Sequence, residues 1–346
     1  MRLAPGDRIV VTGAAGFIGS RITRQLVDGG LHVVALLEPG ADRRNIDGLD
    51  VEAQTVDVRE RNDVIRAVAG ARVVFHTAAI YRFWARDPAL FYDVNVGGTL
   101  NVLEAAARAG AEKVVYTSTV GTLGLHEGRP ADESSFADVS HLFGGYKRSK
   151  YVAEHEVLRA AAQGLPVSLV MPTFPLGPGD RSPTPTGQLV LDFLNGKIPG
   201  FVDTALNVAH VDDVAAGHIL AAEQGATGRS YILGGENQSL KQLLAEMARS
   251  AGLPAPTLHV PRALAMSFAH ASEFVEGRLL HRQPFVPLEA ARMSTTTMVF
   301  DDSRARAELG YAPRPAAEAI SASVRWFVES GLVTPKRLTK IRLPAR

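Results

Sequence analysis

A tyrosine and a lysine four residues apart form the pair of side chains in this sequence that is best suited to move a proton. The spacing places Tyr146 and Lys150 on one face of a helix. A phenol with a pKa near ~10 is a poor acid or base at neutral pH, but an ammonium group one turn away stabilises the phenolate and lowers that pKa. Tyr146 could then exchange a proton with a substrate hydroxyl or carbonyl.

The position of this pair along the chain favours chemistry over packing. Alone, the spacing is more typical of a surface helix with a tyrosine on its buried edge. Here it opens the helix that follows a predicted strand near 113–116, and that strand ends in the hydroxyls of Thr117, Ser118 and Thr119. These hydroxyls could polarise the same substrate oxygen.

Three glycines predict a binding site for a dinucleotide. They stand between an apolar run at 8–11 and apolar residues at helical spacing over 17–27, where a strand turns into a helix. A pyrophosphate rests on the backbone amides and the helix dipole of such a turn, and glycine permits its close approach. A plain structural turn is the alternative, which the strand and helix around it disfavour. The cofactor contacts expected here are Gly13, Ala15, Gly16, Phe17, Ile18 and Gly19.

The choice between NAD and NADP depends on the charges about 20 residues further on. Glu38 stands at the end of the second predicted strand, where a carboxylate binds ribose hydroxyls and repels a 2′-phosphate. It favours NAD, although Arg43 nearby could offset it and admit NADP. Asp57, after the third strand, could contact the adenine edge or serve only as a turn residue.

Alternating strands and helices predict an α/β fold, a Rossmann-type doubly wound parallel sheet. Beyond the first unit, the expected strands lie near 33–37, 52–56, 72–75, 113–116 and 167–170, and the helices at 62–69, 88–108 and 146–162. From Pro172 onward, prolines and glycines break the alternation. The expected domains are an NAD(P)-binding domain at 1–171 and 207–235, a smaller mixed substrate-binding domain at 172–206 and 236–332, and a basic tail at 333–346.

The composition excludes several classes of protein. The 346 residues carry 37 basic and 36 acidic side chains, and the resulting net charge of +1 disfavours nucleic acid as a partner. Without cysteine there is no disulfide, thiolate metal site or cysteine nucleophile. The histidines show no paired ligand spacing, so no metal is expected. The lack of a signal-type or membrane-spanning apolar run predicts a cytoplasmic protein.

The order of these motifs resembles the extended short-chain dehydrogenase/reductase family, also called the NAD-dependent epimerase/dehydratase family. The matching segments, besides the glycine loop and the Tyr146 helix, are His76-Thr77-Ala78-Ala79, Asn95-Val96-Gly97-Gly98-Thr99 and His210-Val211-Asp212-Asp213-Val214. The resemblance implies that Tyr146 is the acid/base, that Lys150 binds the ribose, and that Thr119 holds the substrate oxygen, with Ser118 as the weaker candidate.

The resemblance also implies roles for residues outside this trio. Asn95 would connect the lysine to water, and the segment 210–214 would brace the two domains. Further cofactor contacts are expected along the carboxyl edge of the sheet at Val58, Ala78, Ala79, Pro172 and Thr173.

One departure from the family pattern concerns the substrate. Segments such as 81–84 look like the subgroup of hopanoid-associated sugar epimerases, which is itself similar to dihydroflavonol reductases and 3β-hydroxysteroid dehydrogenases. Nucleotide-sugar enzymes of the family usually carry an arginine and an asparagine where Met171 and Phe174 stand here. The change favours an apolar alcohol or ketone, because an unbonded diphosphate is costly to bury. The expected pocket residues are Tyr81, Phe83, Trp84, Ser118, Leu123, Phe143 and Phe174.

These patterns predict an NAD(P)-dependent oxidoreductase that transfers a hydride between nicotinamide and a secondary alcohol or ketone. Two alternatives stay open: a lipid-linked sugar epimerase or dehydratase that oxidises its substrate only transiently, and a nucleotide-sensing regulator without catalysis. Family habit implies a homodimer through the helices at 88–108 and 146–162. The basic tail could contact an anionic membrane surface, although a solvated, frayed end is the preferred interpretation.

Overall fold

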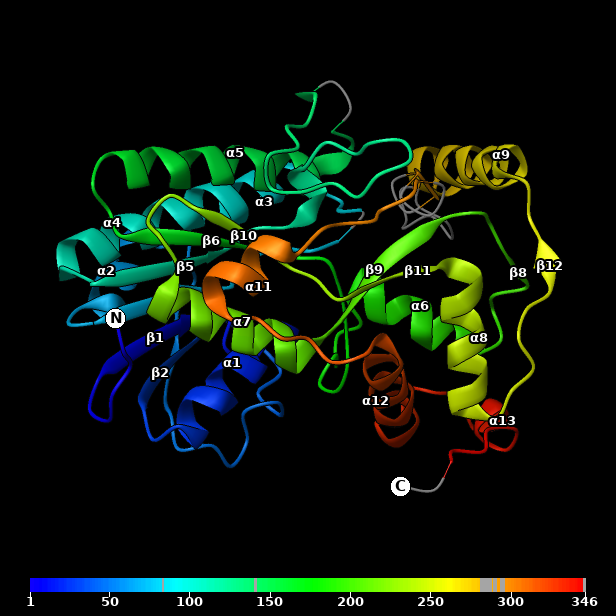
Figure 1. The fold of residues 1–346 in the computed structure, drawn as a ribbon, viewed down its shortest axis with the longest axis horizontal. Helices are drawn as coiled ribbons and strands as arrows, with labels where there is room; N and C mark the ends of the chain where they lie inside the picture. Colours follow the sequence, from blue (N-terminus) through cyan, green and yellow to red (C-terminus); the bar gives the residue numbers. More distant parts are fainter. Residues whose placement is uncertain (83, 140–141, 281–287, 289–290, 293–295, 345–346) are drawn as a thin grey trace.

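A seven-stranded parallel sheet forms the larger domain of the computed structural model (Figure 1), and it confirms the predicted Rossmann-type fold. The structure describes residues 1–82, 84–139, 142–280, 288, 291–292 and 296–344. The strand order is β10-β6-β5-β4-β1-β2-β3. The strands are β1 (Arg8–Thr12), β2 (His32–Leu37), β3 (Glu52–Thr55), β4 (Val73–His76), β5 (Lys113–Thr117), β6 (Val167–Pro172) and β10 (Ser230–Leu233).

Helices cover both faces of this sheet because successive strand residues point to opposite sides. Val11 packs in the core beneath α1 (Phe17–Asp28) and α7 (Val211–Gln224), together with α11 (Ser303–Leu309). Its neighbour Val10 packs in the core beneath the other layer, which is α2 (Arg61–Val68), α4 (Thr99–Ala109) and α5 (Gly144–Ala162). The short α3 (Ala89–Tyr92) and the π-helical η1 (Asp93–Gly98) lead into α4, so the helix expected at 88–108 is present with an irregular first half.

The smaller domain has its own sheet and its own apolar core. Its three strands, in the order β11-β9-β7, are β11 (Glu236–Ser239), β9 (Ala205–His210) and β7 (Phe174–Leu176). Its core is shared by α6 (Pro185–Leu194), α8 (Leu240–Ala251) and α12 (Ala316–Glu329). The remaining elements are η2 (Val120–Thr122), β8 (Gly200–Phe201), β12 (Leu258–His259), α9 (Arg262–Ser272), η4 (Glu273–Leu279) and α13 (Pro335–Leu338).

The path of the chain between the domains differs in two places from the expected boundaries. α11 was expected in the smaller domain at 236–332 but packs in the core of the larger domain. Residues 207–210 were expected in the larger domain but belong to β9, which pairs with β7 and β11. The edge position beside β6 is taken by β10 instead. The chain therefore re-enters the larger domain at α7 rather than at residue 207.

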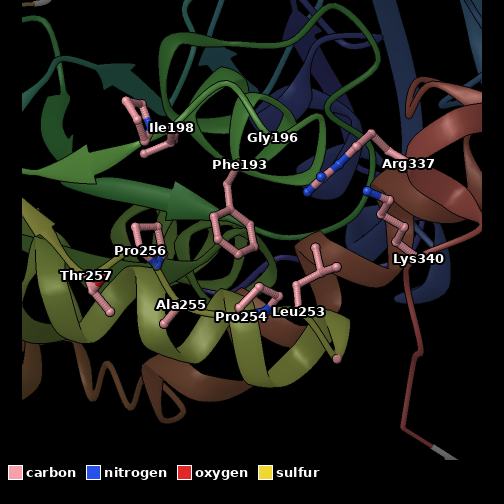
Figure 2. A pocket seen from close by; sticks show the side chains of 12 residues that line it. Phe193, Gly196, Ile198, Leu253, Pro254, Ala255, Pro256, Thr257, Arg337 and Lys340 are labelled. Carbon is pink, nitrogen blue, oxygen red and sulfur yellow. The ribbon is translucent and has the colours of Figure 1, made fainter.

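The basic C-terminal tail is packed, contrary to the preferred expectation of a frayed end. Val333 and Ile341 are 2% and 7% exposed and contribute to the smaller core. The Arg337 Nε donates to the Leu194 carbonyl at 2.8 Å, and the Arg342 amide donates to the Ala251 carbonyl at 2.8 Å. Figure 2 shows the guanidinium of Arg337 beside a hollow of about 450 Å³. Apolar residues interleaved with the basic ones explain the packing, since they anchor the segment while the charges stay at its rim.

Among the helices of the described ranges, none combines the length and the apolar character that a membrane crossing requires.

Candidate active site

The first two turns of α5 bring Tyr146 and Lys150 together on the buried face of the helix, as their spacing predicted. Tyr146 is 8% exposed and Lys150 is 2% exposed. The helix begins against α3, where a Cβ on Gly145 would lie 2.5 Å from the Phe91 ring, so the absence of a side chain allows the close approach. The Tyr81 ring lies 4.6 Å from the Tyr146 ring between centroids. The phenol thus sits at the end of the sheet, between α5 and the segment that follows β4.

Lys150 is held by the end of β5. Its Nζ donates to the Thr117 carbonyl at 2.6 Å and lies 4.3 Å from the centre of the Tyr116 ring. Burial lowers the pKa of Lys150 to about 7, and the charge of Glu154 opposes that shift. An ammonium group in this place is oriented by protein atoms and stands close to losing its proton at neutral pH.

The three strand-end hydroxyls are in different situations. The Ser118 Oγ donates to the Glu154 carboxylate at 2.5 Å and is buried. The Thr119 Oγ1 accepts a hydrogen bond from the Gly121 amide at 3.1 Å, which does not use the hydroxyl hydrogen. Thr119 can therefore donate to a further oxygen, whereas Ser118 is engaged with a carboxylate. Of the two residues predicted to hold the substrate oxygen, the hydrogen bonds therefore favour Thr119 over Ser118.

Asn95 links two segments of the site through its side-chain amide. Its Oδ1 accepts from the Ile80 amide at 2.8 Å, and its Nδ2 donates to the Ile80 carbonyl at 3.2 Å and to the Ser149 Oγ at 2.9 Å. Asn95 therefore fixes the segment after β4 against α5. Its predicted connection from Lys150 to water stays a prediction.

His76 is a buried structural group beneath the site. Its Nδ1 is 2.8 Å from the Thr12 Oγ1, and its Nε2 is 3.0 Å from the Thr99 Oγ1. Complete burial lowers the pKa of His76 to about 3, with Lys150 adding to the shift. The imidazole is neutral at physiological pH and ties β1, β4 and α4 together.

The glycine loop has the geometry that its spacing predicted. Gly13 has a φ of +67°, which favours glycine, and a Cβ on Gly19 would lie 2.2 Å from the Gly13 carbonyl oxygen. Gly16 is exposed at the N-terminus of α1, and a Cβ there would contact only the Gly13 carbonyl oxygen, at 3.1 Å. Ala15 is buried, and Phe17 and Ile18 are half-buried around it. Exposed backbone at a helix N-terminus suits a phosphate.

The residues expected around the adenosine lie at the ends of β2 and β3. Glu38 and Arg43 are both exposed beyond β2. The Asp57 carboxylate accepts from the Arg59 Nε at 3.0 Å, and this hydrogen bond lowers the pKa of Asp57. Asp57 is therefore already engaged in a local turn, and a contact with adenine stays a prediction. Val58 is buried against Gly98.

The residues present fit a dinucleotide at the carboxyl edge of the sheet. Thr173 follows β6, and its buried Oγ1 has no hydrogen-bond partner among the described residues. Pro172 ends β6, and the amide of the half-buried Ala78 donates to the Thr12 Oγ1 at 3.2 Å, with the exposed Ala79 beside it. An unsatisfied buried hydroxyl costs about 1–3 kcal/mol, so a ligand at this edge would remove a penalty.

The expected apolar pocket is only partly assembled. Tyr81 reaches the Tyr146 ring, and the half-buried Trp84 follows in the same segment. Phe143 is 39% exposed beneath the Arg292 guanidinium, which lies 4.1 Å from its ring. Leu123 packs with the cluster around Met171, and Phe174 with the core of the smaller domain. Phe83 lies outside the described residues.

Two residues of the site were missed by reasoning from the sequence. Glu154 accepts hydrogen bonds from Ser118 and Thr122, and its position four residues after Lys150 could have revealed it. Asn45 donates through its Nδ2 to the Ala15 carbonyl at 3.0 Å and to the Gly179 carbonyl at 2.8 Å, which joins the glycine loop to a turn after β7. No local pattern signals a bridge between segments so far apart.

The segment 210–214 joins the two domains, as expected. The His210 side chain accepts from the Asp212 amide at 3.1 Å and caps α7. The Asp213 carboxylate accepts from the Arg314 Nε at 2.9 Å, just before α12 of the smaller domain. Asp212 also pairs with Arg21 on α1.

Comparisons with known proteins agree with this architecture. A model of the NAD dependent epimerase/dehydratase family matches residues 9–234. A Synechocystis protein provisionally named dihydroflavonol 4-reductase is 41% identical over 96% of this chain and 97% of its own. Sterol demethylase protein B of Methylococcus capsulatus is 33% identical over 94% of this chain and 99% of its own. The crystal structure of gox2253 superposes with a TM-score of 0.84 at 42% identity, covering 95% of this chain and 100% of that one.

Proposed function

Because the chain belongs to the NAD-dependent epimerase/dehydratase family of extended short-chain dehydrogenases/reductases, we propose that it is a net oxidoreductase acting on an apolar secondary alcohol or ketone. The observation that supports the proposal is that Tyr146 and Lys150 share the buried face of α5, where the Lys150 Nζ donates to the Thr117 carbonyl, two residues before Thr119. NAD is the proposed cofactor, since the exposed Glu38 stands where a 2′-phosphate would meet a carboxylate.

Each of the three side chains has a separate role in the proton transfer. Bound NAD(H) supplies a hydride donor or acceptor at C4 of the nicotinamide. In the direction of reduction, the Tyr146 hydroxyl gives its proton to the substrate oxygen as the carbonyl carbon gains the hydride. Thr119 donates a hydrogen bond to that oxygen, and Lys150 stabilises the phenolate until a proton returns from solvent.

An apolar substrate is supported by the residues beside the site. Met171 is 1% exposed in β6, and Phe174 follows in β7, so neither position offers a hydrogen bond to a diphosphate. One relative is named for dihydroflavonol and another for a sterol, and both compounds lack a nucleotide. We propose a substrate of this general kind rather than a nucleotide sugar.

Deuteride transfer tests net oxidoreduction directly. The protein would be incubated with 4-deuterated NADH and a panel of apolar ketones, and the products analysed by mass spectrometry. We expect deuterium at the new carbinol carbon and one NAD⁺ formed for each product. Conversion without any change in NADH, by protein that retains NAD through purification, would contradict the proposal and favour the epimerase or dehydratase alternative.

Substitution of the phenol tests the residue assignment. Tyr146→Phe should lower turnover by about 10²–10⁴-fold, because the general acid is lost, while the Kd for NADH changes by less than about 2-fold. Tyr151→Phe is the matched control on the same helix, where the centre of the tyrosine ring lies 4.2 Å from that of His155. Full activity of the Tyr146→Phe variant would overturn the assignment.

A further inference from the structure

A buried carboxylate continues the row of functional side chains along α5. Glu154 lies one turn after Lys150, as Lys150 lies one turn after Tyr146, so the three share a helix face. The residue is only 9% exposed. Glutamate is seldom buried to this degree unless it is paired, because removing a charge from water is costly.

Two hydroxyls from one turn satisfy this carboxylate. The Ser118 Oγ lies 2.5 Å and the Thr122 Oγ1 lies 2.9 Å from the same oxygen, Oε2. Ser118 follows β5 and Thr122 ends η2, so the carboxylate holds both ends of the turn. Thr119 lies between them, with its own Oγ1 fixed by the Gly121 amide. The direction of the Thr119 hydroxyl therefore depends on the contacts of Glu154.

The polar and titratable groups around Glu154 belong to α5, to β5 and to the turn that follows β5. Burial raises the pKa of Glu154 overall, although the hydrogen bonds from the two hydroxyls and the charges of Lys150 and His155 on α5 oppose that shift. From β5, Tyr116 faces the same carboxylate, whose charge raises the pKa of that phenol. In return, the carboxylate opposes the effect of burial on Lys150. Lys150 is thus a buried amine, and Glu154 is the acidic group that raises its pKa against the effect of burial.

We propose that Glu154 is a positioning residue of the site, which fixes the turn that presents Thr119 and supplies a carboxylate one helical turn from Lys150 on the buried face of α5. It touches neither substrate nor cofactor and acts through these two residues. The inference rests on the proposed function, because it assigns Glu154 a part in the same proton transfer.

The pH profile of turnover separates this role from a merely structural one. Glu154→Gln keeps the size of the side chain and removes its charge. Loss of a negative charge favours loss of a proton from both Lys150 and Tyr146, so we expect the limbs of the kcat profile to move to lower pH by about one unit. Glu156→Gln is the matched control, because Glu156 pairs with Arg159 at 2.8 Å on the outer face. This control should leave the profile in place.

A second variant keeps the test decisive if Glu154→Gln does not fold. Glu154→Asp retains the charge but withdraws it from the two hydroxyls, so we expect a lower kcat with the limbs of the profile unmoved. Limbs that stay in place in Glu154→Gln, or that move equally in Glu154→Asp, would overturn the inference. Loss of activity in Tyr146→Phe alongside such a result would leave the proposed function standing, whereas an active Tyr146→Phe would refute that function itself.

Discussion

The cofactor side and the substrate side of the site are built in different ways. On the cofactor side, residues close together in sequence do the work: the glycine loop spans seven positions, and Tyr146 and Lys150 share one helix face. On the substrate side, Tyr81, Leu123 and Phe174 come from separate segments and pack in different clusters. The comparison teaches that a site for a common group can be encoded by local spacing, whereas the shape of a specific pocket is set by how distant segments meet.

The largest effect should come from a substitution that adds a side chain to the glycine loop and so weakens cofactor binding. In Gly19→Ala the new methyl group would lie 2.2 Å from the Gly13 carbonyl oxygen, so the loop must shift. Overpacking of this kind costs about 3 kcal/mol, or about 100-fold in the Kd for NADH measured by fluorescence titration.

Gly48→Ala is the control for this loop. Gly48 also has a positive φ, +76°, but nothing lies within 4 Å of a Cβ there. We expect about 1 kcal/mol of lost stability from backbone strain and an unchanged Kd for NADH. Equal losses of binding in both variants would show that the loop is not a special site.

The two domains should also respond to pH with opposite signs. In the larger domain, burial lowers the pKa of His76 to about 3, so its contribution to stability is present above pH 6.5 and is lost as the pH falls below it. In the smaller domain, burial raises the pKa of Asp180 to about 6, so its contribution is present below pH 3.8 and is lost as the pH rises through 6. Between pH 4 and 7 the effect amounts to about 3 kcal/mol for His76 and about 2 kcal/mol for Asp180.

The two tryptophans allow these effects to be measured separately. Trp84 lies in the segment between β4 and α3 of the larger domain, and Trp326 lies on α12 of the smaller domain. Urea unfolding of Trp84→Phe and Trp326→Phe between pH 4 and 7 should give slopes of opposite sign. Asp180→Asn should flatten the slope reported by Trp326. Parallel slopes from both probes would mean that the domains unfold as one unit.

The smallest expected effect lies in the substrate pocket. Tyr81→Leu should raise KM for the apolar ketone by about 3–10-fold, because an aromatic pair contributes about 0.5–1.5 kcal/mol and its ring lies 4.6 Å from that of Tyr146. Phe174→Leu should change KM by less than about 2-fold, since Phe174 packs in the smaller core. A larger rise in KM for Phe174→Leu than for Tyr81→Leu in steady-state kinetics would place the pocket on the side of β7.

The same contrast explains what could be predicted from the sequence. The alternation of strands and helices, the glycine turn and the Tyr146 helix all depend on periods of a few residues, and each was found in the structure. The place of β9 depends on which strand takes the edge beside β6, a competition between segments. The bridge from Asn45 to Gly179 spans 134 positions and leaves no periodic trace. Glu154 was within reach, because it repeats the spacing that revealed Lys150.

The packed tail bears on the order in which the protein can be completed during synthesis. Five of the seven parallel strands pair within residues 8–117, and β6 follows at 167–172, so most of the larger sheet can form while later residues are still being added. The smaller core, in contrast, includes both Leu176 and Ile341, which lie far apart in the sequence. That core cannot close until residue 341 has left the ribosome, and removal of the segment around Ile341 would expose apolar surface in a domain otherwise already made.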